Sequence, residues 1–194
     1  TIAELFVNNE LRKKVAEIVH DAFGQYLVVD PTSMSTLNYA MADEYPSDVV
    51  ARSFADEAID FFAEAFPLQN ASDGTKAFIG ILTEVMAGAH DILVIDEPEA
   101  FLHPGLAHLL GKEIANNSSD KKQMFVSTHS PHFLMGCISS GTPVDIVRLT
   151  YKSKRATARL LPSGDLKKMM HDPFLKSIGV LGAMFFESSL VVEA

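Results

Sequence analysis

A short apolar stretch that ends in two adjacent acids constrains the fold of this chain more than any other feature. Residues 92–95 read Ile-Leu-Val-Ile, and Asp96, Glu97 and Pro98 follow directly. A short apolar run rich in β-branched residues indicates a strand buried on both faces of a parallel sheet. Carboxylates at the end of such a strand are costly unless a partner neutralises them. A Mg²⁺ ion that carries phosphate oxygens is such a partner, because this hard cation prefers carboxylate and water ligands.

A second apolar strand follows and runs into a histidine. Met124-Phe-Val leads into Ser-Thr-His129, and residues 104–116 between the two strands have helical periodicity. A strand–helix–strand unit places its parallel strands side by side, so that their carboxyl ends meet at one crevice. We therefore expect His129 to lie beside Asp96 and Glu97, where an imidazole can contact a γ-phosphate. Taken alone, the acids fit a turn and the histidine fits a structural position; the pairing favours the site.

A third element lies upstream, at Ser72-Asp73-Gly74. Ser72 is a suitable N-cap for a helix with an apolar face formed by Phe78, Ile81, Leu82 and Val85. The free N–H groups and positive dipole end of such a helix suit a phosphate. This tripeptide is a common helix start, so its meaning depends on its position ahead of the acidic strand.

These three elements resemble the signature motif, the Walker B motif and the switch histidine of the ABC-type ATPases. Within that superfamily the chain resembles the branch that contains the SMC-like and overcoming-lysogenisation-defect proteins. Two segments look especially like the overcoming-lysogenisation-defect family and its ATPase relatives: Asp96-Glu-Pro-Glu-Ala-Phe-Leu-His-Pro104 and Ser127-Thr-His-Ser-Pro131. The matching region runs from about Ser72 to Leu134, roughly a third of the chain.

The resemblance implies a role for each motif residue, with ATP and Mg²⁺ as cofactors. Asp96 would bind the magnesium ion, Glu97 would be the catalytic glutamate and His129 would contact the γ-phosphate. The loop Ser72, Asp73 and Gly74 would contact the nucleotide of a second subunit in a head-to-tail homodimer. His103 occupies the D-loop position where transporters of this superfamily carry an aspartate, so contacts at that joint can differ.

A phosphate-binding P-loop reads Gly-x-x-x-x-Gly-Lys-Ser/Thr after a strand. Its nearest counterpart, Gly105 to Lys112, has one residue too many and carries Glu113 where a magnesium-binding hydroxyl is needed. The stretch also falls inside the helix expected over residues 104–116, so we reject it. In the resembled ATPases the P-loop precedes the signature motif. We therefore expect this chain to be the C-terminal part of an ABC-type P-loop ATPase domain, with weak or no ATP turnover alone.

The expected architecture is an α/β fold with a mainly parallel sheet, flanking helices and a small helical and β-stranded lobe that bears the signature motif. Residues 1–70 would form the lobe and residues 71–187 the ATPase core. Residues 188–194 form an apolar stretch that leads into Glu193 and resemble the first strand of a TOPRIM nuclease domain, which follows the ATPase in overcoming-lysogenisation-defect proteins. A strand that ends in an acid by chance fits these few residues as well.

Other segments predict packing elements. We expect a helix over residues 11–22 that stops at Gly24, strands over residues 26–30 and 37–40, and a helix over residues 50–66 whose aromatic residues pack in the core. Residues 144–150 and 156–161 predict a hairpin with a charged turn. Ser163 is a candidate cap for a helix over residues 166–170.

Composition restricts the cellular setting and the partners. The net charge of −9 argues against strong non-specific DNA binding by these residues alone. DNA as a partner of the full-length protein is what the resemblance to the overcoming-lysogenisation-defect and SMC-like proteins implies. The basic clusters at residues 12–14, 121–122 and 152–155 are interpreted as solvated. A single cysteine suits a reducing, cytoplasmic compartment, and no apolar run approaches the ~20 residues that span a bilayer.

Two other functions fit the same residues. A metallohydrolase could bind zinc or another divalent metal through His103, His129, His132 and the two acids. Against this function, the two histidine rings of the stretch His129-Ser-Pro-His132 need not point toward the same metal. The chain can also be a non-catalytic dimerisation or docking module with an ATPase-like fold.

Overall fold

The computed structural model describes residues 1–33, 36–119 and 121–166. The N-terminal half holds α1 (Ile2–Val7), α2 (Asn9–Phe23), β1 (Tyr26–Asp30), β2 (Asn38–Ala42), η1 (Val50–Arg52), α3 (Asp56–Glu64), β3 (Phe66–Pro67) and η2 (Leu68–Asn70). The remainder holds α4 (Asp73–Ala87), β4 (Ile92–Asp96), α5 (Pro104–Asn116), β5 (Gln123–Ser127), α6 (Pro131–Ser139), β6 (Ile146–Lys152) and β7 (Arg155–Leu161). The segment 188–194 with Glu193, most of the helix expected over residues 166–170 and the end of the expected core lie outside the described residues.

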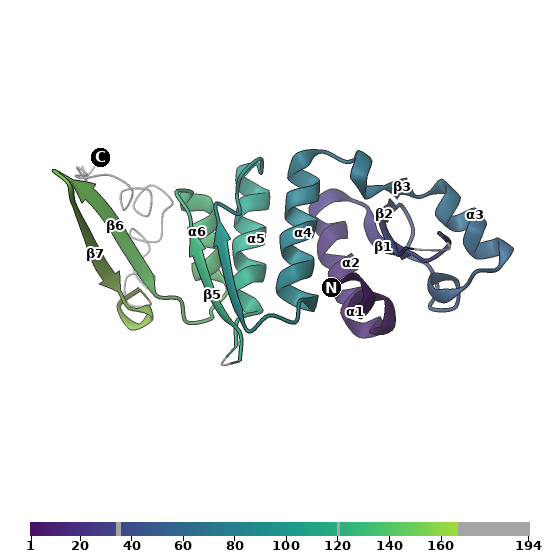
Figure 1. The fold of residues 1–194 in the computed structure, drawn as a ribbon, viewed down its shortest axis with the longest axis horizontal. Coiled ribbons are helices and arrows are strands. Elements are labelled where there is room, and N and C mark those ends of the chain that lie inside the picture. The colour runs from purple at the N-terminus through teal and green to yellow at the C-terminus, as the bar shows by residue number, and fades with distance from the viewer. Residues whose placement is uncertain (34–35, 120, 167–194) are drawn as a thin grey trace, which may run out of the picture.

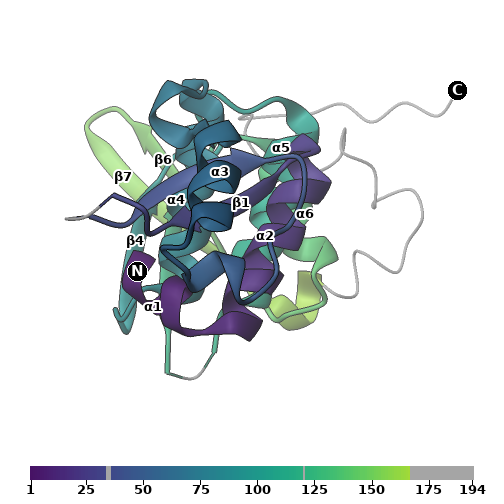
Figure 2. The ribbon, with the colours of Figure 1, turned by 90° about the vertical axis from the view of Figure 1, so that its right-hand side faces the viewer.

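The elements form an elongated row. Figure 1 shows the β6–β7 hairpin at one end, then β4 and β5 against α5 and α6, then α4, α2 and the β1–β2 pair, with α3 at the other end. Figure 2 views the molecule along this row from the α3 end. Among the described residues, no helix is long and apolar enough to cross a lipid bilayer.

The strand–helix–strand unit forms as the sequence predicts. β4 and β5 pair in parallel with Asp96 opposite Ser127, and α5 lies between them in the chain. The expectation that the strand is buried on both faces is wrong. Ile92 and Val94 are 62% and 78% exposed, because within the described residues the parallel sheet has two strands and is covered by helices on one face only.

One core joins the N-terminal lobe to the strand–helix–strand unit. Its buried residues come from both sides of the expected boundary at residue 71. They include Leu5, Val15, Val19, Leu27, Met41, Phe78, Leu82, Leu110 and Phe133. Four partly buried residues of β4 and β5 pack against this core: Leu93, Ile95, Met124 and Val126. Burial of this apolar surface is the main stabilising contribution. A second cluster of buried residues, which includes Val28, Ala58 and Phe62, lies wholly within the N-terminal lobe, and the division at residue 71 stays a prediction.

The helix expected over residues 50–66 is broken. Ser53 Oγ accepts a hydrogen bond from Ala55 N–H and interrupts the chain after η1, and Phe66 pairs with β2 as a short strand. Phe66 precedes Pro67, and a residue before proline disfavours the helical conformation. Ala58 and Phe62 are buried as expected, whereas Phe54 and Phe66 are 66% and 44% exposed and do not pack in the core.

Helices α5 and α6 pack closely because each has a glycine at the contact. A Cβ added to Gly111 would lie 2.3 Å from the carbonyl oxygen of Phe133, and one added to Gly136 would lie 2.0 Å from that of His108. Gly111 is the second glycine of the rejected P-loop candidate. Its place inside α5 confirms the rejection and gives this glycine a packing role.

The β6–β7 hairpin has two unlike faces. Directly opposite residues of an antiparallel pair share a face. Arg148 lies opposite Arg159 and Lys152 opposite Arg155, so the cations share one face with the hydrogen-bonded Thr150 and Thr157. The other face is apolar and exposed; it carries Val147, Leu149, Tyr151, Ala156, Ala158 and Leu160. Ser153 and Lys154 both have positive φ, as a two-residue type I′ turn requires.

Candidate functional site

The candidate site lies where β4 and β5 end. Asp96 and Ser127 are register partners, and Ser127 Oγ donates a hydrogen bond to Asp96 Oδ1. Both residues are exposed and share the uncovered face of the strand pair with Val94 and Phe125. The Asp96 carboxylate is therefore accessible to a ligand from solvent.

Glu97 turns the chain away from the sheet at the next position. Its N–H donates to the carbonyl oxygen of Ser127 at 3.0 Å, which extends the ladder by one bond. Its φ of 44° lies in the left-handed region, which is unfavourable for a residue with a Cβ. This conformation places Glu97 Oε1 3.1 Å from His129 Nδ1, as the sequence predicts for two neighbouring strand ends.

The histidine is held by a second acid that the sequence analysis did not assign. Glu99 Oε1 accepts hydrogen bonds from Thr128 Oγ1 at 2.6 Å and from the His129 N–H at 3.1 Å. Glu99 is only 7% exposed, whereas the side chains of Glu97 and His129 are 54% and 72% exposed. The sequence signal was a third acid between the Walker B-like acids and the next helix, next to a proline.

The signature-like tripeptide begins α4 and contacts the turn after Glu97. Ser72 Oγ accepts from the Thr75 N–H at 3.1 Å, as predicted for an N-cap, and Asp73 pairs with Lys76 at 2.9 Å. A Cβ on Gly74 would lie 2.6 Å from the carbonyl oxygen of Phe101. Only glycine allows this approach, so Gly74 joins the signature-like loop to the acidic turn within one chain.

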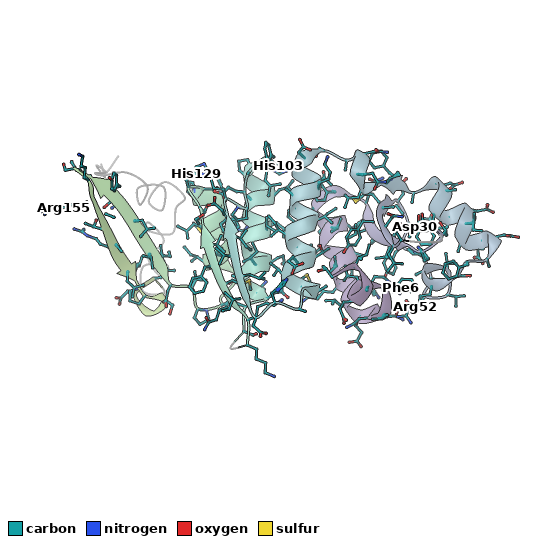
Figure 3. All side chains as sticks on the ribbon, viewed as in Figure 1. Phe6, Asp30, Arg52, His103, His129 and Arg155 are labelled. Atoms are coloured by element: carbon teal, nitrogen blue, oxygen red, sulfur yellow. The ribbon has the colours of Figure 1, made fainter. Side chains whose placement is uncertain are left out.

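His103 caps α5. Its Nδ1 accepts from the backbone N–H groups of Gly105 and Leu106 at 3.1 and 3.4 Å, so the ring proton of the neutral form is on Nε2. His129 and His103 both lie along the upper edge of the molecule in Figure 3. A nucleotide contact by His103 remains a prediction.

The donor set fits magnesium better than zinc. Within residues 1–33, 36–119 and 121–166, no three histidine, cysteine, aspartate or glutamate side chains form a metal-binding group. A zinc site needs three or four such ligands. Magnesium is typically held by one or two carboxylates together with waters and substrate phosphates, which is what the exposed Asp96 with its neighbouring Ser127 hydroxyl offers.

Two basic side chains that were interpreted as solvated have structural roles. Lys122 Nζ donates to the carbonyl oxygens of Val85 and Gly88 at 2.7 and 3.1 Å, and so caps the C-terminal end of α4. Arg12 is 3% exposed, donates to the Phe6 carbonyl at 2.9 Å and pairs with Asp48 at 3.1 Å.

The fold is of the α/β class, and a family comparison places the chain among ATPase domains. The chain belongs to the family described as "AAA domain, putative AbiEii toxin, Type IV TA system", whose model matches residues 39–135. This is a family of P-loop ATPases, so membership implies nucleotide binding. No curated protein matches the chain.

A solved structure supports the fold. It comes from work on "ATP-driven dimerization and DNA stimulated activation of SMC ATPases", and it matches with a TM-score of 0.50 at 12% identity. The match covers 83% of this chain and 89% of that one. The predicted resemblance to SMC-like ATPases is thereby confirmed at the level of fold, while the finer assignment to the overcoming-lysogenisation-defect group remains a prediction.

Proposed function

We propose that this chain supplies the hydrolytic residues of an ATP site. The observation that carries the proposal is the convergence of Asp96, Glu97 and His129 at the ends of two neighbouring parallel strands, with Glu97 Oε1 3.1 Å from His129 Nδ1. Membership of an ATPase family supports nucleotide as the ligand of this site.

Each residue has a distinct task in this proposal. Asp96 holds the magnesium ion, which when bound neutralises charge on the nucleotide phosphates. Glu97 is exposed enough to reach a water molecule, which it orients or deprotonates for attack on the γ-phosphate. The exposed ring of His129 would contact the γ-phosphate. These 194 residues contain no Gly-x-x-x-x-Gly-Lys-Ser/Thr, so turnover by this mechanism would require a phosphate-binding loop from another segment or chain.

We also propose that ATP closes a head-to-tail homodimer. The N-terminal end of α4 would present Ser72, Asp73 and Gly74 to the nucleotide of the other copy, because free N–H groups and the helix dipole favour phosphate. By the same proposal, the full-length protein is an overcoming-lysogenisation-defect type or SMC-like ATPase in which closure gates DNA processing.

The β6–β7 hairpin is the surface that best suits a DNA contact. Residues 146–161 contain no acid in a chain of net charge −9, and their cations are Arg148, Lys152, Lys154, Arg155 and Arg159. Arg155 and Arg159 lie on the same face of β7, where the phosphate backbone of DNA would contact them.

Glu97→Gln tests the ATPase proposal. In a protein that combines this chain with a phosphate-binding loop, the substitution keeps the shape of the side chain and removes its basicity. We expect ATP turnover to be abolished while nucleotide binding persists. Glu64→Gln, the same change on the exposed surface of α3, is the matched control and should leave turnover unchanged.

The remaining functions are separate outcomes of this experiment. Turnover that survives Glu97→Gln would contradict the assigned mechanism. Nucleotide-dependent dimers without any turnover in the wild-type protein would favour the non-catalytic dimerisation module. Activity that requires zinc and persists in Glu97→Gln would favour the metallohydrolase.

A further inference from the structure

The buried carboxylate of Glu99 joins the two halves of the candidate site. Glu99 lies in the turn that follows Glu97, and its Oε1 accepts hydrogen bonds from the hydroxyl and the backbone of the segment Thr128–His129. Its Oε2 is buried and has no hydrogen-bond partner among the described residues. A buried carboxylate that is only partly satisfied costs free energy, so its presence requires an explanation.

The position of Glu99 determines where the His129 ring can lie. His129 Nδ1 is 3.1 Å from Glu97 Oε1 and 3.5 Å from Glu99 Oε1. Carboxylate oxygens accept and cannot donate, so a ring nitrogen that faces two of them is stable there only when it carries a proton. The second ring nitrogen, Nε2, is then left for a ligand, and the side chain is 72% exposed.

We propose that Glu99 is a positioning residue that acts through His129. Glu99 anchors the Thr128–His129 backbone to the turn of Glu97 and holds Nδ1–H of the ring against the carboxylates. Nε2 is thereby directed outward. The further step rests on the proposed ATPase function: Nε2 carries no proton in this tautomer, so it would accept a hydrogen bond from a water molecule that also donates to a γ-phosphate oxygen.

A purely structural role for Glu99 makes a different prediction. If the carboxylate only stabilised the turn, its removal would lower stability without changing the protonation site of the His129 ring. The two roles are separated by ¹⁵N and ¹H shifts of the histidine ring in this chain, which report whether Nδ1 or Nε2 carries the proton. Neither nucleotide nor turnover is needed for that measurement.

Glu99→Ala is expected to shift His129 from the Nδ1-protonated state toward the Nε2–H tautomer. Glu99→Gln should restore the wild-type ring signals in large part, because its amide oxygen can accept from Thr128 Oγ1 and the His129 N–H. Thr128→Val removes one of the two donors and should give an intermediate effect. Glu64→Ala, on the exposed surface of α3, should change none of these signals.

The kinetic test uses the ATPase assembled with a phosphate-binding loop. Glu99→Ala should lower kcat by roughly ten- to a hundredfold, as for a misplaced catalytic group, with little change in KM. Unchanged ring signals and kcat in a folded Glu99→Ala protein would overturn the proposal. If that variant does not fold, unchanged His129 signals in both Glu99→Gln and Thr128→Val would overturn it.

These outcomes are distinct from failure of the ATPase assignment. If turnover survives Glu97→Gln but the signals of the His129 ring still respond to Glu99→Ala, the positioning role of Glu99 is supported and the proposed ATPase mechanism is contradicted. If Glu97→Gln abolishes turnover and Glu99→Ala leaves both ring and kcat unchanged, the reaction stands and the positioning role is wrong.

Discussion

At the scale of single residues, the candidate site stores backbone strain. Glu97 and Phe101 have φ values of 44° and 65°, and neither is glycine. Such conformations cost on the order of 1–3 kcal/mol each and persist where neighbouring contacts hold them. Here the Glu97 N–H bonds Ser127, and the carbonyl of Phe101 lies against Gly74. The strained turn is therefore held by the elements that carry the other two motifs.

The motif residues were predictable from sequence, and their anchors were not. Asp96, Glu97 and His129 follow apolar strands, so the parallel-sheet rule places them together. Glu99 and Lys122 act through partners that are distant in the chain: Thr128 for Glu99, and Val85 and Gly88 for Lys122. Composition cannot distinguish a charge that caps a distant helix from one that is solvated.

The single thiol gives a pH-dependent prediction. Cys137 is 8% exposed, and burial raises the pKa of its thiol to about 12 from an ordinary value near 9. The folded state therefore binds the proton more tightly than the unfolded state. The corresponding stabilisation is complete below pH 9 and is lost as the pH rises toward 12.

Cys137→Ser isolates this effect. Between pH 9 and 12, the free energy of unfolding of the wild-type protein should fall more steeply than that of Cys137→Ser. Urea titrations over that range measure the difference. Parallel curves for the two proteins would show that the thiol is not buried as described, as would rapid modification by Ellman's reagent at pH 8.

At the scale of elements, the sequence predicted helices by their periodicity and boundaries by their caps. As expected, Ser72 caps the start of α4 and Gly24 caps the end of α2, where its φ of 76° lies in the left-handed region. The prediction of one helix over residues 50–66 was wrong for two reasons. Pro67 disfavours the helical conformation of Phe66, and the side chain of Ser53 bonds the backbone of Ala55 and interrupts the helix, although the apolar residues have helical spacing. The prediction that β4 is buried on both faces was wrong, because the apolar pattern of a strand does not show how many faces of the sheet are covered.

The contact between α5 and α6 gives a stability prediction. Gly111→Ala places a methyl group against the Phe133 carbonyl and should destabilise the fold by about 1–3 kcal/mol. Gly80→Ala in α4 is the matched control, because nothing lies within 4 Å of its added Cβ. That change should stabilise the protein by up to about 1 kcal/mol through helix propensity. Equal unfolding midpoints for the two variants would contradict the close packing of these helices.

At the scale of the whole molecule, the β6–β7 hairpin differs from the remainder of the chain in charge: it has cations and no acid, whereas the whole chain has a net charge of −9. Arg155→Glu combined with Arg159→Glu reverses two cations on one face of β7. We expect weaker binding to duplex DNA and a salt dependence whose log–log slope is shallower by about two. Fluorescence anisotropy at several salt concentrations measures both quantities.

Lys13→Glu combined with Lys14→Glu is the control for net charge, because it makes the same change on the exposed surface of α2. If both double variants weaken DNA binding equally, the effect is one of overall charge and the hairpin is not the contact surface. Absence of binding by the wild-type chain at low salt would have the same meaning.

The measurement that tests the central claim most directly is ATP turnover and oligomeric state of Glu97→Gln, beside the wild-type protein and Glu64→Gln, in the presence of a phosphate-binding loop. The account predicts that turnover is lost only in Glu97→Gln, and that ATP then traps this variant as a dimer in size-exclusion chromatography with light scattering. Turnover by Glu97→Gln at the wild-type rate, or turnover lost equally in Glu64→Gln, would contradict the assignment of Glu97 as the catalytic glutamate of an ATPase.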